Sequence, residues 1–248
     1  ECDVKTNTVT EKKFGRVGLY GEKAGVVFSN VAIGGRKQDT ITANITGELT
    51  VEDGEYTSLT DDAWCLFGEE KAVDYTFSAD VTFSGDSRSC KMSVWNERLE
   101  SVGDIYQPYW APKRIKGYNW SIVNGESYIE GIKRSAVQFT TPKIKVEIDY
   151  NTVNNMKMIA KNNTIECYLN GKLVNTYTVE PFPAITSVAT VDDSANEVII
   201  KIINISSNDE TVKINLDQHV NSTTAKGSIL VSDDRNDVNS FDNKHNVT

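Results

Sequence analysis

Apolar and polar residues alternate with a period of two along much of the chain, most clearly in "NTIECYLNGKLV" at residues 163–174. Ile165, Cys167 and Leu169 fall on one face of an extended strand, and the residues between them fall on the other. Asn170-Gly171 follows directly, and this pair supplies the positive φ angles that a type I′ turn requires. The segment therefore predicts a β-hairpin with a two-residue turn.

Short runs rich in Val, Ile, Thr, Tyr and Phe recur along the chain between clusters of Gly, Asn, Asp and Ser, with almost no helical period. The runs include 16–21, 25–33, 74–84, 89–96, 117–124, 127–134, 143–151, 155–162 and 172–179. Many short strands separated by turn residues are typical of a β-sandwich or jelly roll. The expected fold class is therefore all-β.

Pro181 and Pro183 interrupt this pattern. Proline cannot donate the ladder hydrogen bond of a central strand, so the chain is expected to leave the first sandwich here. The segment 197–205, "EVIIKIINI", then predicts a buried strand, and 210–218 and 226–232 predict partners for it. Two domains are expected, a sandwich at 1–181 and a smaller antiparallel β-domain at 182–248 that is too small to bury both of its faces alone.

The acidic composition narrows the range of partners. The 248 residues include 35 acidic and 26 basic ones, which gives a net charge of −9, and the basic residues are scattered singly. This charge disfavours nucleic acid as a partner. No apolar run is long enough for a transmembrane helix, so no membrane role is expected. The sequences at the two ends indicate a piece of a longer protein.

Cysteine and acidic residues suggest little metal chemistry. The four cysteines, Cys2, Cys65, Cys90 and Cys167, lack the spacing of a zinc site, so buried thiols are the first interpretation and one disulfide the alternative. Three acidic doublets could offer oxygen ligands to a structural calcium ion, although such doublets are also typical of turns. They are Asp61-Asp62, Asp192-Asp193 and Asp233-Asp234. No other cofactor is expected.

No pair of carboxylates stands out as catalytic. Glu97 in "SVWNERLE" follows a predicted strand, as the acid/base residue of many barrel glycosidases does. The chain, however, has neither the helices nor the length for such a barrel. A Gly-x-Ser-x-Gly nucleophile motif is also absent. We therefore expect no catalytic residue, and whether the protein is an enzyme stays open.

The densest group of aromatic residues lies in "DIYQPYWAPKRIKGYNW". Prolines and a glycine predict a loop in its first half, and packing in a hydrophobic core does not easily explain large aromatic side chains in a loop. Exposed Trp and Tyr rings can stack on the apolar faces of sugars. The candidate carbohydrate-binding residues are therefore Tyr106, Tyr109, Trp110, Tyr118 and Trp120, and the alternative is that these rings fold back and cap the sandwich.

Two parts of the chain resemble known relatives. The segment "YNWSIVNGESYIEGI" (118–132), together with the hairpin, resembles the concanavalin-like, laminin-G-type sandwich of some alpha-L-arabinofuranosidases. "SVATVDDSANEVIIKIINIS" and the later "VNSFDNKHNV" (238–247) resemble their C-terminal β-domain. Val123-Asn124 replaces a Gly-Gly pair of that family and Lys244 replaces a turn proline. The catalytic barrel of the family is missing.

The resemblance implies a non-catalytic, carbohydrate-associated fragment of a secreted or cell-surface arabinofuranosidase-like glycoside hydrolase. Such a fragment would bind an arabinose-containing plant polysaccharide or oligosaccharide and pack against the catalytic barrel of the same protein. The alternatives are a part of the hydrolase proper or a purely structural module. The resemblance further implies that residues 14–35 supply the closing strands of the sandwich, unless they remain from a truncated preceding domain.

Overall fold

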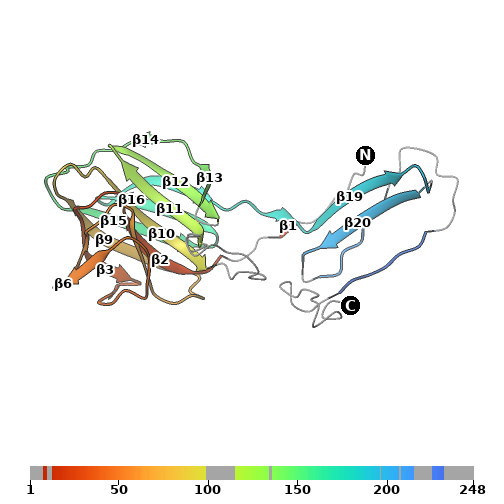
Figure 1. Ribbon diagram of the computed structural model, residues 1–248, viewed down its shortest axis with the longest axis horizontal. Helices are drawn as coiled ribbons and strands as arrows, with labels where there is room; N and C mark the ends of the chain where they lie inside the picture. The colour runs from red at the N-terminus through yellow and green to blue at the C-terminus, as the bar shows by residue number, and fades with distance from the viewer. Residues whose placement is uncertain are drawn as a thin grey trace. The chain divides into compact units, whose positions relative to one another are not determined.

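The computed structural model describes residues 8–9, 13–98, 115–133, 136–195, 197–206, 208–214 and 225–231. Within these ranges the chain forms strands and no helix (Figure 1), which confirms the expected all-β class. None of the described residues form a helix that is long and apolar enough to cross a membrane. The chain divides into two compact units, Lys12–Val179 and a second unit made of Glu1–Glu11 with Glu180–Thr248.

The larger unit contains two antiparallel sheets, which we call sheet 1 and sheet 2. The strand order in sheet 1 is β13 (Ala136–Thr140), β12 (Glu126–Lys133), β11 (Ile115–Val123), β10 (Ser89–Arg98), β2 (Arg16–Gly21), β8 (Ala63–Phe67) and β5 (Ala43–Thr46), and β14 (Ile144–Lys145) also pairs with β12. The order in sheet 2 is β17 (Lys172–Thr178), β16 (Thr164–Leu169), β15 (Asn154–Lys161), β9 (Tyr75–Phe83), β3 (Val26–Ile33), β7 (Glu55–Ser58) and β6 (Leu49–Glu52), and β4 (Arg36–Lys37) also pairs with β3.

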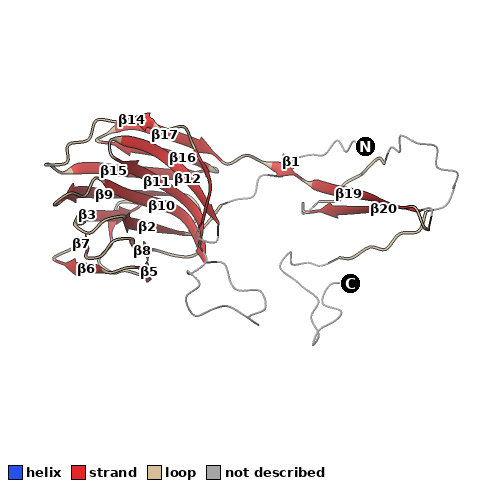
Figure 2. Ribbon diagram, turned by 45° about the horizontal axis from the view of Figure 1, so that its top comes forward, coloured by secondary structure: helices blue, strands red, loops and turns tan. Residues whose placement is uncertain are grey.

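The two sheets stack face to face around one apolar core (Figure 2). In strands such as β9, β15 and β16, alternate residues point into this core, as the period of two requires. Sheet 1 contributes Leu19, Met92 and Trp120, and sheet 2 contributes Phe28 and Phe77, all of them fully buried. The arrangement is the β-sandwich expected from the alternation.

The first two strands of the larger unit, β2 and β3, lie inside the two sheets and not at their edges. β2 lies between β10 and β8 in sheet 1, and β3 lies between β9 and β7 in sheet 2. Residues 14–35 are therefore part of both sheets of the sandwich.

The hairpin expected at 163–174 is confirmed. Leu169 of β16 faces Lys172 of β17, which leaves Asn170 and Gly171 as a two-residue turn with φ angles of 50° and 79°. The Asn170 side chain also accepts a hydrogen bond of 2.7 Å from the backbone N–H of Asn155. This bond ties the turn to the neighbouring strand β15.

The smaller unit contains two short β-ladders. β1 (Thr8–Val9) pairs with β18 (Phe182–Pro183), and β19 (Ile185–Asp192) pairs with β20 (Glu197–Asn204). At the turn after β19, the Asp192 carboxylate accepts hydrogen bonds from Ser194 and from the backbone N–H of Ala195, which lowers the pKa of Asp192. The described residues within the two further strands expected here, 210–214 and 226–231, form no β-pairing.

Three of the four cysteines are buried thiols. Cys65, Cys90 and Cys167 are free and fully buried, which confirms the first interpretation for these residues, whereas Cys2 lies outside the described residues. Burial raises the pKa of Cys65 to about 12 and raises the pKa of Cys90 and Cys167 above the usual thiol range. The nucleophilic thiolate is therefore scarce at all three positions near neutral pH.

We expect these three thiols to be unreactive in the native protein. In a Cys2→Ser variant at pH 8, a thiol reagent should modify no cysteine during the time in which it fully modifies free glutathione. The reagent cannot reach the buried sulfur atoms, and few of them are ionised to thiolate. After denaturation in urea all three thiols should react. Rapid modification of the native variant would contradict the burial of the thiols.

Candidate functional site

One face of sheet 1 packs on the core, and the other face points away from it; we call the latter the outer face. The strand register lines up five outer-face residues on neighbouring strands, in an arrangement that we call the cross-sheet row. From β12 to β8, the row consists of Tyr128, Ser121, Lys91, Tyr20 and Trp64.

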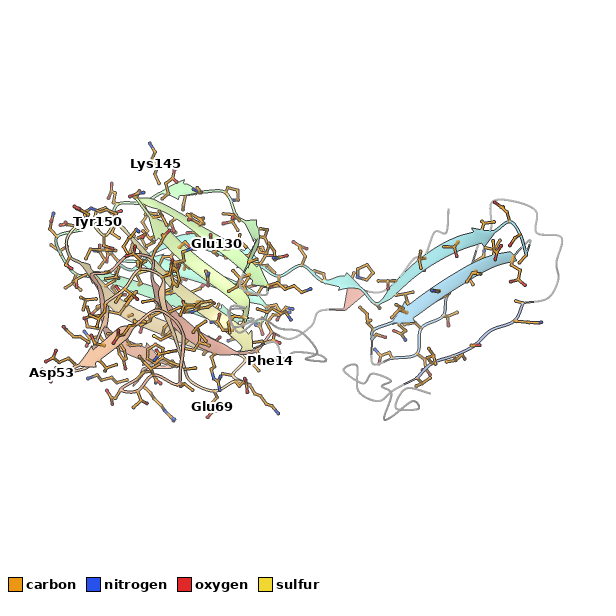
Figure 3. All side chains as sticks on the ribbon, viewed as in Figure 1. Phe14, Asp53, Glu69, Glu130, Lys145 and Tyr150 are labelled. Atoms are coloured by element: carbon orange, nitrogen blue, oxygen red, sulfur yellow. The ribbon has the colours of Figure 1, made fainter. Side chains whose placement is uncertain are left out.

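A buried charge pair lies at the middle of this row. Lys91 Nζ donates a hydrogen bond of 3.1 Å to Oε2 of Glu130, which is on β12 two residues beyond Tyr128. Ser121 Oγ donates to the same oxygen at 2.9 Å. The side chains of Lys91 and Glu130 are only 15% and 9% exposed. Figure 3 shows Glu130 on the part of the sheet that β11 and β12 form.

Aromatic rings flank the charge pair on both sides. Lys91 Nζ lies 5.2 Å from the centre of the Tyr20 ring, within the range of a cation–π contact. The Tyr20 ring in turn packs edge to face against Trp64, with 6.1 Å between ring centres. The hydroxyl of Tyr20 donates to the Asp62 carboxylate. On β12, Tyr128 is nearly buried beside Ser121.

Both tyrosine hydroxyls are held in the protonated state. Burial raises the pKa of Tyr20, and the hydrogen bond to Asp62 and its negative charge raise it further. Burial also raises the pKa of Tyr128, with smaller contributions from Glu130 and Glu22. Both phenols therefore stay protonated at neutral pH, and the O–H of Tyr20 is already donated to Asp62.

An apolar cluster lies beside the polar residues on the same face. Its members come from β8, β11 and β12 and are Trp64, Leu66, Ile115 and Ile132. Gly18 leaves room for it, because a Cβ atom there would lie 2.8 Å from Leu66 Cδ2 and 2.5 Å from Ser93 Oγ. The outer face thus combines a fixed cation, a fixed anion, hydroxyl groups and the partly exposed Tyr20 ring, which suits a ligand rich in both C–H and O–H groups.

The predicted aromatic residues are placed differently. Tyr106, Tyr109 and Trp110 lie outside the described residues, so their role stays a prediction. Trp120 is fully buried between the sheets, and its indole N–H donates to Ser127 Oγ at 2.8 Å, so its ring presents no face to a ligand. Tyr118 is partly buried and packs against three aromatic rings, those of Trp95, Phe139 and Tyr177. The rings of the two described residues, Tyr118 and Trp120, therefore pack inside the sandwich.

The acidic candidates are engaged in local contacts. Glu97 lies 3.4 Å from Lys116 in an ion pair between neighbouring strands. Asp61 accepts hydrogen bonds from Lys23 and from the backbone N–H of Ala24, which lower its pKa. Within the described part of the chain, no group of three or more His, Cys, Asp or Glu side chains could hold a metal ion. The Asp233-Asp234 doublet lies outside the described residues.

Sequence reasoning missed the residues of the cross-sheet row and Glu130. Lys91 in "SCKMSVWN" and Glu130 in "SYIEGIKR" are both ionisable residues in the middle of runs that otherwise predict sheltered strands. That signal was available. The sequence does not show that Lys91 and Glu130 lie 3.1 Å apart, because this contact depends on the register of β10 against β11 and of β11 against β12.

Comparison with known families identifies one match. A family model described as the 3-keto-alpha-glucoside-1,2-lyase-like domain matches residues 32–243. No curated protein and no solved structure matches the chain. The match agrees with the lectin-like, carbohydrate-associated sandwich expected from the sequence, whereas the resemblance to arabinofuranosidases has no counterpart in it.

Proposed function

The chain belongs to the family of 3-keto-alpha-glucoside-1,2-lyase-like domains, and from this premise we propose that its sandwich binds a saccharide on the outer face of sheet 1. The observation that carries the proposal is the buried pair of Lys91 and Glu130 at the middle of the cross-sheet row. A buried ion pair contributes little net stability, because desolvation offsets the attraction between the charges. Lys and Glu side chains are rarely buried in folded proteins, so a pair held in such surroundings calls for an explanation.

The contacts assign a role to each group. Lys91 keeps further N–H donors for sugar oxygens, since an ammonium group has three and Glu130 takes one. The Tyr20 ring, which is only partly buried, offers a surface for the C–H face of a sugar ring, and the buried Trp64 ring supports it edge to face. This division of polar and apolar groups is what a pyranose requires for binding in one orientation.

Glu130 favours a second candidate function, proton abstraction. Both hydrogen bonds that described residues donate to this carboxylate end on Oε2, so Oε1 keeps its lone pairs for a ligand. In a 3-keto glucoside the ketone acidifies the hydrogen on C2. If Oε1 takes that proton, the electron pair forms a C1–C2 double bond while the C1–O bond breaks. The departing oxygen takes a proton from solvent and leaves as an alcohol.

The arabinose-containing ligand expected from the sequence stays a proposal for Tyr106, Tyr109 and Trp110. It is supported by the resemblance of residues 118–132 and of the C-terminal segments to arabinofuranosidases. The same resemblance supports a catalytic barrel as partner and a secreted or cell-surface location. A loss of arabinoxylan-oligosaccharide binding in Trp110→Ala would support this ligand, and unchanged binding would exclude the loop.

Calorimetric titration tests saccharide binding. The wild-type protein is expected to bind a methyl 3-keto-alpha-glucoside or methyl alpha-glucoside. Lys91→Gln should weaken this binding at least tenfold, because Gln still donates to Glu130 but lacks the charge. Lys157→Gln is a matched control, since Lys157 Nζ lies over the Tyr168 ring at 4.5 Å on sheet 2. No binding by the wild type, or equal losses in both variants, would contradict the proposal.

The elimination has its own test, the release of nitrophenol from a nitrophenyl 3-keto-alpha-glucoside. Glu130→Gln should reduce the rate by about a hundredfold or more, the usual contribution of a positioned general base. Binding of the methyl 3-keto-alpha-glucoside by this variant should persist. A wild-type protein that binds the sugar and releases no nitrophenol would leave binding as the function and exclude elimination.

A further inference from the structure

We infer that Trp64 and Glu22 form a hydrogen-bonding subsite for a hydroxyl group of the bound sugar, at the β2–β8 end of the cross-sheet row. The inference rests on the proposed function, because the subsite belongs to the same outer face. It goes further in naming the two atoms, Trp64 Nε1 and Glu22 Oε2, that would select for this hydroxyl group.

The first observation is an indole N–H without a partner. Trp64 is 7% exposed, and its Nε1 atom is buried with no hydrogen-bond acceptor. The other two described tryptophans are satisfied, since Trp95 Nε1 donates to the Val73 carbonyl at 2.7 Å and Trp120 Nε1 donates to Ser127 Oγ at 2.8 Å. A buried unpaired donor is costly and rare in folded proteins, and is often explained by a ligand or water.

The second observation is an unpaired acceptor near the same end of the row. Oε2 of Glu22 is buried and has no donor among its neighbours. Glu22 follows β2, two residues beyond Tyr20, and its backbone carbonyl accepts the N–H of Asp62 next to β8. The charge of Glu22 contributes to the raised pKa values of both Tyr20 and Tyr128. Because Glu22 follows Tyr20 by two residues, the alternation of an extended chain places it on the same side of the sheet as the cross-sheet row.

A hydroxyl group placed between the two atoms would satisfy both of them. Its oxygen accepts from the indole N–H, and its hydrogen is donated to the carboxylate. Tyr20 separates this subsite from the Lys91–Glu130 pair along the row, because the Tyr20 ring contacts both Lys91 and Trp64. The hydroxyl group is therefore expected at a different position of the sugar from the one that faces Glu130.

The test combines one substitution with a set of deoxy sugars. Trp64→Phe keeps an aromatic ring against Tyr20 and removes the N–H. Trp120→Phe makes the same change at an indole that already has a partner. The probes are methyl alpha-glucoside and its 2-, 3-, 4- and 6-deoxy analogues, with affinities measured by calorimetry and folding checked by thermal melting.

For methyl alpha-glucoside, the wild-type protein should have an affinity about fivefold to tenfold higher than that of Trp64→Phe. For one of the deoxy analogues, the two proteins should have the same affinity. Such non-additivity identifies the partner of the indole. Glu22→Gln should lose affinity for the same hydroxyl group. Trp120→Phe should melt earlier yet keep the wild-type preference among the analogues.

Two results would overturn the inference while leaving the proposed function intact. In one, the wild type binds the sugar and Trp64→Phe binds it equally well, as expected if water alone satisfies the indole. In the other, the affinity of Trp64→Phe is lower than that of the wild type by the same factor for methyl alpha-glucoside and for every deoxy analogue. If the wild type binds no sugar at all, the proposed function fails first and this subsite fails with it.

Discussion

Replacing Trp120 by alanine is expected to lower the free energy of unfolding by about 3–5 kcal/mol, the range measured for removal of large buried aromatic side chains. Trp120 is fully buried between the sheets, and its indole N–H donates to Ser127 Oγ. Ser127 also donates to Asn175 on the facing sheet. The substitution therefore leaves a cavity and breaks a hydrogen-bond chain that joins β11, β12 and β17.

Urea unfolding followed by fluorescence measures this effect, with Tyr168→Ala as the control. Tyr168 lies on the outward side of sheet 2 and pairs with Glu166 on its own strand, so its loss should cost far less. A cost below about 1 kcal/mol for Trp120→Ala would show that Trp120 is not a core residue, and would return it to the group of candidate sugar-binding residues.

Breaking the buried charge pair is expected to have an effect of similar size. Lys91→Met leaves the Glu130 carboxylate sheltered with only Ser121 as partner, and unpaired charges of this kind cost about 3–5 kcal/mol. The double variant Lys91→Met/Glu130→Leu removes both charges and should unfold within about 1–2 kcal/mol of the wild type. Saccharide binding should be lost in the double variant despite this recovery of stability.

A thermodynamic cycle of the two single variants and the double variant measures this coupling. Lys116→Met is a suitable control, because the pair of Lys116 and Glu97 is more exposed and should contribute less than about 1 kcal/mol. If the double variant is stable and still binds sugar with wild-type affinity, the pair has a structural role only. If Lys91→Met lowers the free energy of unfolding no more than Lys116→Met does, the pair of Lys91 and Glu130 is solvated. The proposed site, which rests on a buried pair, is then wrong.

The local features of the fold could be predicted because they depend on neighbouring residues. The turn at Asn170-Gly171 follows from positive φ angles that these two residue types accept readily. The burial of Trp120 could also have been predicted, because Ile122 lies two residues later and must share its face. Tyr118 falls on that face for the same reason.

The cross-sheet row could not be predicted, because its members come from five strands whose order does not follow the chain. Tyr20 lies beside Lys91, and Tyr20 also lies beside Trp64, although long stretches of sequence separate them. A β-bulge adds to the difficulty: Trp95 has a φ of 51°, and the register of β10 shifts on both sides at this point. Simple alternation fails there, since both Val94 and Trp95 are buried.

The central position of β2 and β3 has a consequence for the nascent chain. During synthesis β2 emerges long before its partner β10, and β3 emerges long before β9. Sheets built from strands that are distant in sequence form slowly, because the chain loses the conformational entropy of a large loop before the strand contacts contribute stabilising free energy. The pairings of β2 with β10 and of β3 with β9 are therefore expected to form late, after the shorter-range pairing of β3 with β4.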